Sequence, residues 1–258
     1  MKSFVIFSVL GQNYGVDIES VKRILPGQEL TDVPDEGPHI EGIFQYEDNV
    51  LKVLSFRKAI EKKSYEEELE EKFIELKSEH KDWFDALKQS VDTGEPFTKG
   101  TEPHACHLGR WIDSFHADDE EVLLLMKKLS YYHQNLYSSA KDALQKRDVN
   151  VDEARKMFED NVTENYKHTL EYLDKVSGLS SRVAAELQRC MIIEGKDGSS
   201  FGLNIDEVED IVHIEDEELH EVKEAQYMGD FMDVAAILSH NKQLVTIIKD
   251  ITLEKRSA

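Results

Sequence analysis

The sequence predicts an α+β protein in which a helical bundle interrupts a β domain. Residues 1–60 and 187–254 contain short apolar runs punctuated by Gly and Pro, which is typical of strands and turns. The intervening part carries long charged stretches with apolar residues three and four positions apart, which indicates amphipathic helices. The two β-like ends also resemble each other. We therefore expect three segments, residues 1–62, 63–182 and 183–258, of which the first and third form one domain.

The resemblance between the two ends is an internal repeat. Residues 14–25 align without gaps with residues 201–212, and both read aromatic, Gly, apolar, polar, Ile, acidic, polar, Val, two polar residues, Ile and apolar. A second, shorter echo pairs residues 50–54 with residues 244–248. Unrelated strands also look alike, but twelve gapless positions are long for coincidence. Two related β units on either side of an unrelated segment indicate a pseudo-symmetric β fold with an insertion.

The middle segment predicts helices through its apolar faces. The first face comprises Leu69, Phe73, Leu76, His80, Trp83 and Leu87. The second comprises Val122, Met126, Leu129, His133, Leu136, Ala140 and Leu144, and a weaker third comprises Phe158, Val162, Asn165, Thr169, Tyr172 and Val176. A shorter helix is expected over residues 106–115. Four antiparallel helices form a bundle whose ends lie close together, so such a bundle fits inside a loop of another domain.

Charge and cysteine content exclude several classes of protein. The 258 residues include 53 acidic and 31 basic side chains, a formal net charge of −22, which argues against nucleic-acid binding and disfavours anionic membranes. No apolar run approaches the roughly 20 residues that span a bilayer. The N-terminus alternates like a strand and lacks a signal-peptide cleavage pattern. The sequence contains two cysteines, Cys106 and Cys190, which do not indicate a disulfide framework, so we expect a reducing cytoplasm.

Two histidines and one cysteine predict a metal site in the bundle. His80 and His133 lie on the first two apolar faces, where a single histidine is usually a satisfied core residue. Cys106 lies in the short third element, and all three side chains can converge if the helices pack on their apolar faces. Zinc prefers imidazole nitrogen and thiolate sulfur in tetrahedral geometry. We expect one zinc ion per chain.

The middle segment resembles the chemoreceptor zinc-binding (CZB) domain family. That family's pattern is His-x-x-Trp, then Cys-x-Leu-Gly-x-Trp, then His-x-x-x-His. Residues 80–83 match the first part, residues 106–111 match the second after 22 residues, and His133 begins the third after 21. The resemblance implies His80, Cys106 and His133 as zinc ligands.

The fourth family ligand is replaced by Tyr137. Three possibilities remain open for that position. Water fills it, giving an open site; Tyr137, His104, His107 or His168 substitutes; or the site is weakened and the helices are held mainly by their core.

The two β-like ends resemble the CheW-type chemotaxis coupling domain. The resemblance lies in residues 4–7, 14–18, 21–25, 33–34, 42–44 and 50–54, and in residues 201–208 and 244–248. It implies two SH3-like β barrels, and binding to a CheA-type histidine kinase and to the cytoplasmic tips of chemoreceptors. The family's Asn-Leu-Arg-Gly turn reads Gln45-Tyr46-Glu47-Asp48 here, so Glu47 reverses the charge of an arginine implicated in partner contact. Glu47 and Asp48 are therefore candidate partner-binding residues, or simply a solvated turn.

The predicted function is that of a non-enzymatic signalling adaptor with a zinc-binding helical insert. No phosphate-binding Gly loop, Ser/His/Asp pattern or HExxH motif occurs. A thiolate held by zinc at Cys106 is also open to oxidants, which predicts oxidant or zinc sensing. The alternatives are a zinc sensor or buffer that no longer couples chemoreceptors, and a zinc enzyme with an open coordination position.

Overall fold

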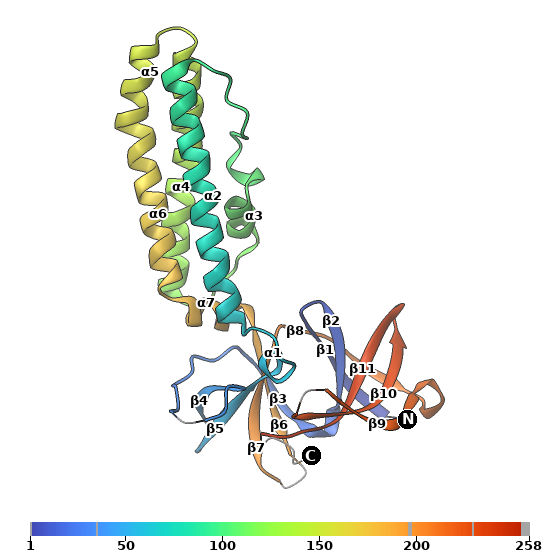
Figure 1. Cartoon of the computed structure of the whole chain (residues 1–258). Helices are drawn as coiled ribbons and strands as arrows, with labels where there is room; N and C mark the ends of the chain where they lie inside the picture. Colours follow the sequence, from blue (N-terminus) through green and yellow to red (C-terminus); the bar gives the residue numbers. More distant parts are fainter. Residues whose placement is uncertain (1, 35, 196–197, 229, 254–258) are drawn as a thin grey trace. The chain divides into compact units, whose positions relative to one another are not determined.

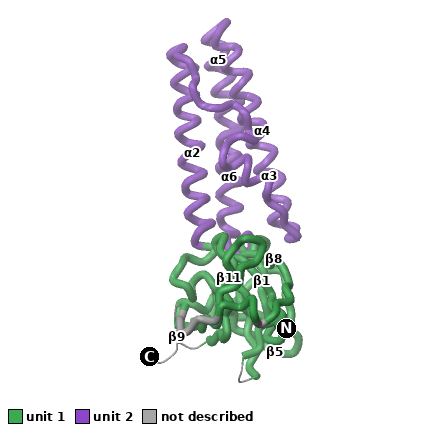
Figure 2. Tube along the Cα trace, turned by 90° about the vertical axis from the view of Figure 1, so that its right-hand side faces the viewer, with its two compact units in different colours: residues 1–66, 184–258 green, residues 67–183 purple. Residues whose placement is uncertain are grey.

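The computed structural model describes residues 2–34, 36–195, 198–228 and 230–253, with backbone alone at residue 216 and residues 221–227. The chain divides into two compact units (Figure 2). Residues 1–66 and 184–258 form unit 1, and residues 67–183 form unit 2. Helix α2 (Tyr65–Thr93) leads from unit 1 into unit 2, and helix α7 (Ser180–Leu187) leads back. Unit 1 is thus built from both ends of the chain.

Unit 1 contains two mixed β-sheets and the short helix α1 (Phe56–Ala59). Its strands are β1 (Lys2–Val9), β2 (Gln12–Asp17), β3 (Val21–Pro26), β4 (Ile40–Tyr46), β5 (Asn49–Ser55), β6 (Arg189–Glu194), β7 (Ser200–Ile205), β8 (Glu207–Ile214), β9 (His220–Met228), β10 (Met232–His240) and β11 (Gln243–Ile251). One sheet has six strands in the order β8-β1-β2-β11-β10-β9, and the other has five in the order β3-β6-β7-β5-β4 (Figure 1). We expected two barrels. The strand pairings of the described residues form two sheets and do not join the outer strands of either.

Each sheet takes strands from both ends of the chain. Strand β2 pairs in parallel with β11, and β7 pairs in parallel with β5. The order β8-β1-β2-β11-β10 in one sheet therefore corresponds to β3-β6-β7-β5-β4 in the other. The sequence repeat falls on the strands that this correspondence equates. Residues 14–25 cover most of β2 and β3, residues 201–212 cover most of β7 and β8, and the shorter echo pairs β5 with β11. The two ends of the chain complete each other's sheets.

The core of unit 1 follows from strand alternation. In β1, Val5, Phe7 and Val9 point to one face and join a cluster with Phe56 and Phe201, while Phe4 and Ile6 point to the other face and join a second cluster. The N-terminus was expected to alternate, but residues 4–7 are all apolar, because both faces of β1 are buried. The rings of Phe7 and Phe56 meet edge to face at 5.1 Å. The second cluster contains Val212 of β8 and Val245 of β11, so the core also joins both chain ends.

Unit 2 is built of helices joined by loops, and its described residues contain no strand (Figure 1). Besides α2, it contains α3 (His107–Ser114), α4 (Glu120–Arg147), α5 (Val151–Met157) and α6 (Thr163–Ser177). All six residues of the first predicted apolar face are buried, which confirms that face. Asp119 begins α4 by accepting a hydrogen bond from Val122 N at 2.9 Å. Near the two ends of unit 2, Ser180 Oγ donates to Glu70 Oε1 at 3.4 Å, so those ends lie together.

The expected count of four helices is not confirmed. Six α-helices of the described residues, α2 to α7, lie wholly or partly in unit 2. The predicted third face lies on a π-helical turn at Phe158–Val162 and on α6, and the π-helical turn separates α6 from α5. Thr163 Oγ1 donates to Phe158 O, five residues earlier, at 3.1 Å. The wider turn keeps Phe158 and Val162 buried but breaks the regular α-helix, which the apolar spacing does not reveal. No helix in the described ranges has the length and apolar character needed to cross a membrane.

Candidate metal centre

Three side chains from separate elements of unit 2 converge in its interior. His80 comes from α2, Cys106 from the residue before α3, and His133 from α4. One ring nitrogen of each histidine and the sulfur of Cys106 lie within 4.8 Å of one another. His80 and His133 are each 2% exposed, and their ring centroids are 5.3 Å apart. The structure therefore brings the three predicted ligands together.

Local packing around α3 places Cys106. Cys106 is the N-cap of α3, and its sulfur accepts a hydrogen bond from Gly109 N at 3.2 Å. Gly109 lies so close to Pro103 that a Cβ would stand 1.8 Å from the carbonyl oxygen of Pro103, which excludes any side chain there. Leu108 is fully buried, and Trp111 packs edge to face on Phe73 of α2 at 5.4 Å. Each residue of the Cys-x-Leu-Gly-x-Trp motif therefore helps to hold the sulfur at the centre of unit 2.

His80 is oriented as a metal ligand. Its Nδ1 lies 2.8 Å from the carbonyl oxygen of Leu76, one turn earlier in α2. A carbonyl only accepts hydrogen bonds, so Nδ1 carries the hydrogen and the neutral ring presents a lone pair at Nε2. That Nε2 is buried and has no hydrogen-bond partner among the described residues. An unpaired buried acceptor costs about 1–3 kcal/mol, and a bound cation would remove this cost.

Electrostatics keep both histidines neutral. Burial lowers the pKa of His80. Burial and the neighbouring His80 lower the pKa of His133 to about 3. Neutral imidazole is the form that binds metal, so neither histidine has to release a proton near neutral pH. With His133 Nε2 at 3.3 Å from Cys106 Sγ, the two-nitrogen, one-sulfur donor set fits zinc.

Tyr137 is the one proposed fourth ligand that lies at this centre. Its side chain is 2% exposed, and its ring lies 4.9 Å from that of His133 and 4.6 Å from that of Trp83, measured between centroids. Burial and Cys106 raise the pKa of Tyr137, so the side chain remains a phenol near neutral pH.

The three histidines proposed for the fourth position contact acidic side chains. His104 Nδ1 contacts Asp113 at 2.8 Å, and His107 Nδ1 contacts Glu79 at 2.6 Å. His168 lies 3.2 Å from Glu171 and stacks on Tyr132. Exposed acidic partners engage these rings, as expected for surface histidines.

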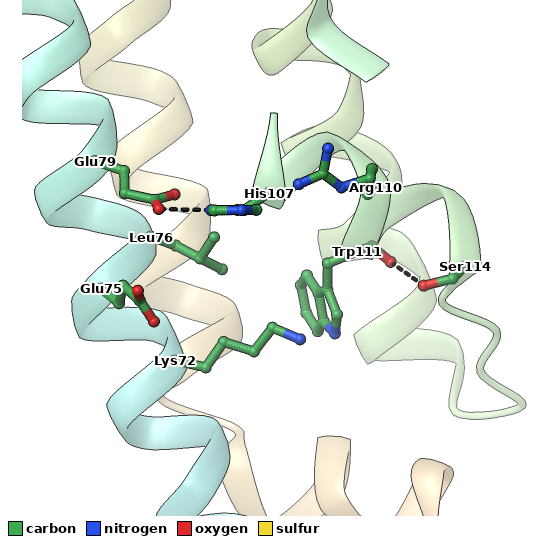
Figure 3. Close-up of a pocket in the computed structure, with 8 residues that line it drawn as sticks. All are labelled: Lys72, Glu75, Leu76, Glu79, His107, Arg110, Trp111 and Ser114. Carbon is green, nitrogen blue, oxygen red and sulfur yellow. Dashed lines mark hydrogen bonds and ion pairs between the residues drawn. The ribbon is translucent and has the colours of Figure 1, made fainter. Parts of the chain in front are cut away.

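A cavity of about 220 Å³ opens beside the three converging side chains. It is lined by Glu79, His80, Trp83, Lys99, Ala105, Cys106, His107, Arg110 and Tyr137. A larger groove of about 490 Å³ between α2 and α3 shares Glu79, His107 and Arg110 with this cavity (Figure 3). The sequence analysis did not single out Glu79, Lys99 or Arg110. Glu79 and Arg110 stand near ligands in the sequence, whereas Lys99 lies in a loop whose course only the tertiary structure reveals.

Glu47 and Asp48 lie in unit 1, at the tip of the β4–β5 hairpin. Tyr46 pairs with Asn49, so the two residues form the turn, and both are exposed. Glu47 adopts a left-handed backbone with φ of 53°, which is uncommon for a residue other than glycine. Their contact with a partner stays a prediction.

Comparisons with known proteins point to one family. A family model described as the CheW-like domain matches residues 3–83, which include β1 to β5, α1 and much of α2. A comparison with curated proteins finds no match. Among solved structures, the chain is similar to the scaffolding protein TtCheW from Thermoanaerobacter tengcongensis, with 13% sequence identity and a TM-score of 0.46 over 98% of this chain and 91% of that chain. The similarity to TtCheW is too low to support an argument. The family match over residues 3–83 is therefore the finding used below.

Proposed function

We propose that this protein is a non-enzymatic chemotaxis adaptor that couples chemoreceptors to a CheA-type histidine kinase. The observation that carries the proposal is the CheW-like match over residues 3–83. The organisation of unit 1 supports extending it to the second chain end, because β6 and β7 complete the sheet that contains β3, β4 and β5. Coupling proteins of this kind act by binding partner proteins through their surfaces.

We further propose that unit 2 is a CZB-like domain that binds one zinc ion and regulates the adaptor. His80, Cys106 and His133 would hold the ion, and the unpaired buried Nε2 of His80 is the observation that favours a metal there. Zinc would supply a structural link between α2, α3 and α4 and would keep Cys106 as a thiolate.

Metal analysis and partner binding together test both parts. Purified wild type should contain one zinc per chain, and Cys106→Ala should lose most of it. Cys190→Ala is the matched control, because Cys190 is buried in β6 of unit 1 and far along the chain from the proposed ligands. Equal zinc in all three proteins would remove Cys106 from the site.

The adaptor function itself is tested with the histidine kinase and receptor fragments from the same cell. The zinc-loaded protein should bind both in a pulldown, and chelation should change the affinity of at least one of them. Binding of zinc without any binding of kinase or receptor would instead favour a zinc sensor or buffer that no longer couples chemoreceptors.

An oxidant-sensing role follows from the position of Cys106. Cys106 is half-buried and borders the cavity, whereas burial raises the pKa of Cys190 to about 12 and makes it unreactive. Stoichiometric hypochlorite or peroxide should therefore oxidise Cys106 first, release zinc and alter kinase binding. If Cys106 is oxidised while zinc stays bound and the affinity for the kinase is unchanged, zinc is purely structural.

A zinc enzyme is the second candidate, and one observation favours it. Glu79 lines the same cavity as the three proposed ligands, and catalytic zinc sites pair three protein ligands with a nearby carboxylate base. Glu79, however, is engaged by His107 at 2.6 Å. Hydrolysis of ester or peptide substrates that disappears in Glu79→Gln while zinc content is unchanged would support this candidate over the adaptor.

A further inference from the structure

We propose that a metal ion held by His80, Cys106 and His133 keeps one exchangeable coordination position that binds a small monovalent anion. In this arrangement Tyr137 donates a hydrogen bond to the sulfur of Cys106 and does not bind the metal. The inference rests on the proposed zinc site and adds to it a ligand-binding function. Four observations carry it: the packing of Tyr137, the absence of a fourth donor among the described residues, the cavity, and the charge around that cavity.

The packing of Tyr137 keeps its side chain in place. Its ring is held between Trp83 and His133, and Trp83 is itself fixed because its Nε1 donates to Gly100 O at 2.8 Å. A tightly packed interior leaves the ring little room to move toward a metal ion.

No other side chain of the usual ligand types completes the group. Among the described His, Cys, Asp and Glu residues, the cluster with ligand atoms within 4.8 Å of one another contains three members. Glu79 is the acidic residue next to His80 in the sequence, and its carboxylate bonds to His107. Zinc favours four ligands, so a three-residue set leaves one position for a ligand from solution.

The cavity gives such a ligand space and access. It has a volume of about 220 Å³, and its lining includes Cys106, His80 and Tyr137. The volume suits water or an anion of a few atoms. His80 Nε2, which is buried and unpaired among the residues that the structure describes, marks the metal end of the cavity.

The charges around the cavity favour an anion. Lys99 and Arg110 line it and are exposed, and the structure shows no ion pair of Lys99 with any described residue. Arg110 Nη1 donates to Ala105 O at 2.6 Å, which leaves the other guanidinium donors available. Glu79 opposes an anion, but its carboxylate is engaged by His107 Nδ1 at 2.6 Å, as Figure 3 shows. A divalent cation with two flanking basic side chains attracts monovalent anions.

Cobalt-substituted protein and azide test the proposal by spectroscopy. Co²⁺ bound to a thiolate absorbs visible light, and its d–d bands report a change of ligand. Azide should change these bands in the wild type and in Tyr137→Phe, which cannot bind metal through this side chain. Tyr137→His places an imidazole one turn after His133 on the same face of α4, so it should fill the position and abolish the response to azide. In Tyr137→Phe the sulfur-to-metal band should also move to lower energy, because the thiolate loses a hydrogen-bond donor.

A second pair of variants tests the role of charge. Lys99→Gln should weaken azide binding by about two- to five-fold, in line with an exposed charge, without changing cobalt affinity. Lys167→Gln is the matched control, since Lys167 is exposed on α6 and does not line the cavity. Equal effects of the two substitutions would remove the charge argument.

The outcomes separate this inference from the zinc site itself. If the wild type binds one Co²⁺ with a sulfur-to-metal band that Cys106→Ala lacks, but azide changes nothing, the exchangeable position is refuted and the metal site stands. If only Tyr137→Phe responds to azide, Tyr137 is a ligand in the wild type and the proposal is wrong. If Co²⁺ does not bind, the metal site itself fails.

Discussion

Replacing Gly109 by alanine should weaken zinc binding, although Gly109 cannot itself be a ligand. An added Cβ would stand 1.8 Å from Pro103 O, 2.8 Å from Pro103 C and 3.1 Å from His104 Cα. Real Cβ atoms essentially never come within 3.0 Å of another atom, so the backbone of α3 and residues 103–104 must separate by at least 1.2 Å. Cys106 lies between the two segments and bonds to both, through Gly109 N at 3.2 Å and Pro103 O at 3.3 Å. The sulfur therefore has to move.

The size of the effect follows from this displacement. Altered support around a metal ligand typically costs 10- to 100-fold in affinity, so we expect a loss of about that size. Forced separation of packed backbone costs about 1–3 kcal/mol of unfolding free energy, of which the better helix propensity of alanine returns up to about 1 kcal/mol. Zinc affinity should consequently fall more clearly than stability.

A chelator competition titration measures the affinity, and urea unfolding measures the stability. Gly178→Ala is the matched control within unit 2, since its added Cβ would meet no atom closer than 3.5 Å and its φ is −68°. If Gly109→Ala binds zinc as tightly as Gly178→Ala and the wild type, the contact between Gly109 and Pro103 does not position Cys106, and the reasoning is refuted.

Three further predictions concern acid stability, the core of unit 1 and partner binding. The pKa of His133 is lowered to about 3, so the folded, metal-free protein prefers a neutral His133. Its unfolding free energy should therefore fall by about 1.4 kcal/mol per pH unit as the pH drops from 6.5 to 3. In acid-unfolding titrations this fall should be steeper than that of His133→Gln. Arg57 is 4% exposed, and its guanidinium donates to both carboxylate oxygens of Asp206 at 2.7 Å. Asp206→Asn should therefore lower the unfolding free energy by about 3 kcal/mol in urea. A change near zero would show that the ion pair is dispensable. Glu47→Arg should raise the affinity for the histidine kinase or receptor about ten-fold, measured by calorimetry. It should not alter stability, since Glu and Arg have the same backbone strain at a φ of 53°. Asp48→Arg is the control at the neighbouring position, and unchanged binding would show that this turn does not contact the partner.

Helical periodicity was sufficient to locate the ligands on their helices. The faces that contain His80 and His133 were readable because buried residues recur every three or four positions in an α-helix. The first face is buried throughout, and the second is buried except for the half-buried Leu144. The internal repeat likewise indicated which strands are equivalent. The repeat concerns local sequence, so it could not show which strands pair. In the structure β2 pairs with β11 and β7 with β5, and each pairing joins strands from opposite ends of the chain.

The surroundings of the ligands were decided by tertiary packing alone. His104, His107, His168, Tyr137 and water were all candidates for the fourth position in the sequence. In the structure His107 contacts Glu79, whereas Tyr137 packs against His133 and lines the cavity. The hydrogen bond of His80 to Leu76 selects the nitrogen that faces the site. The sequence by itself determined which residue types occupy the helix faces, because that depends on a period of 3.6 residues. Which atoms meet across those faces depends on how separate helices pack, and no local pattern encodes it.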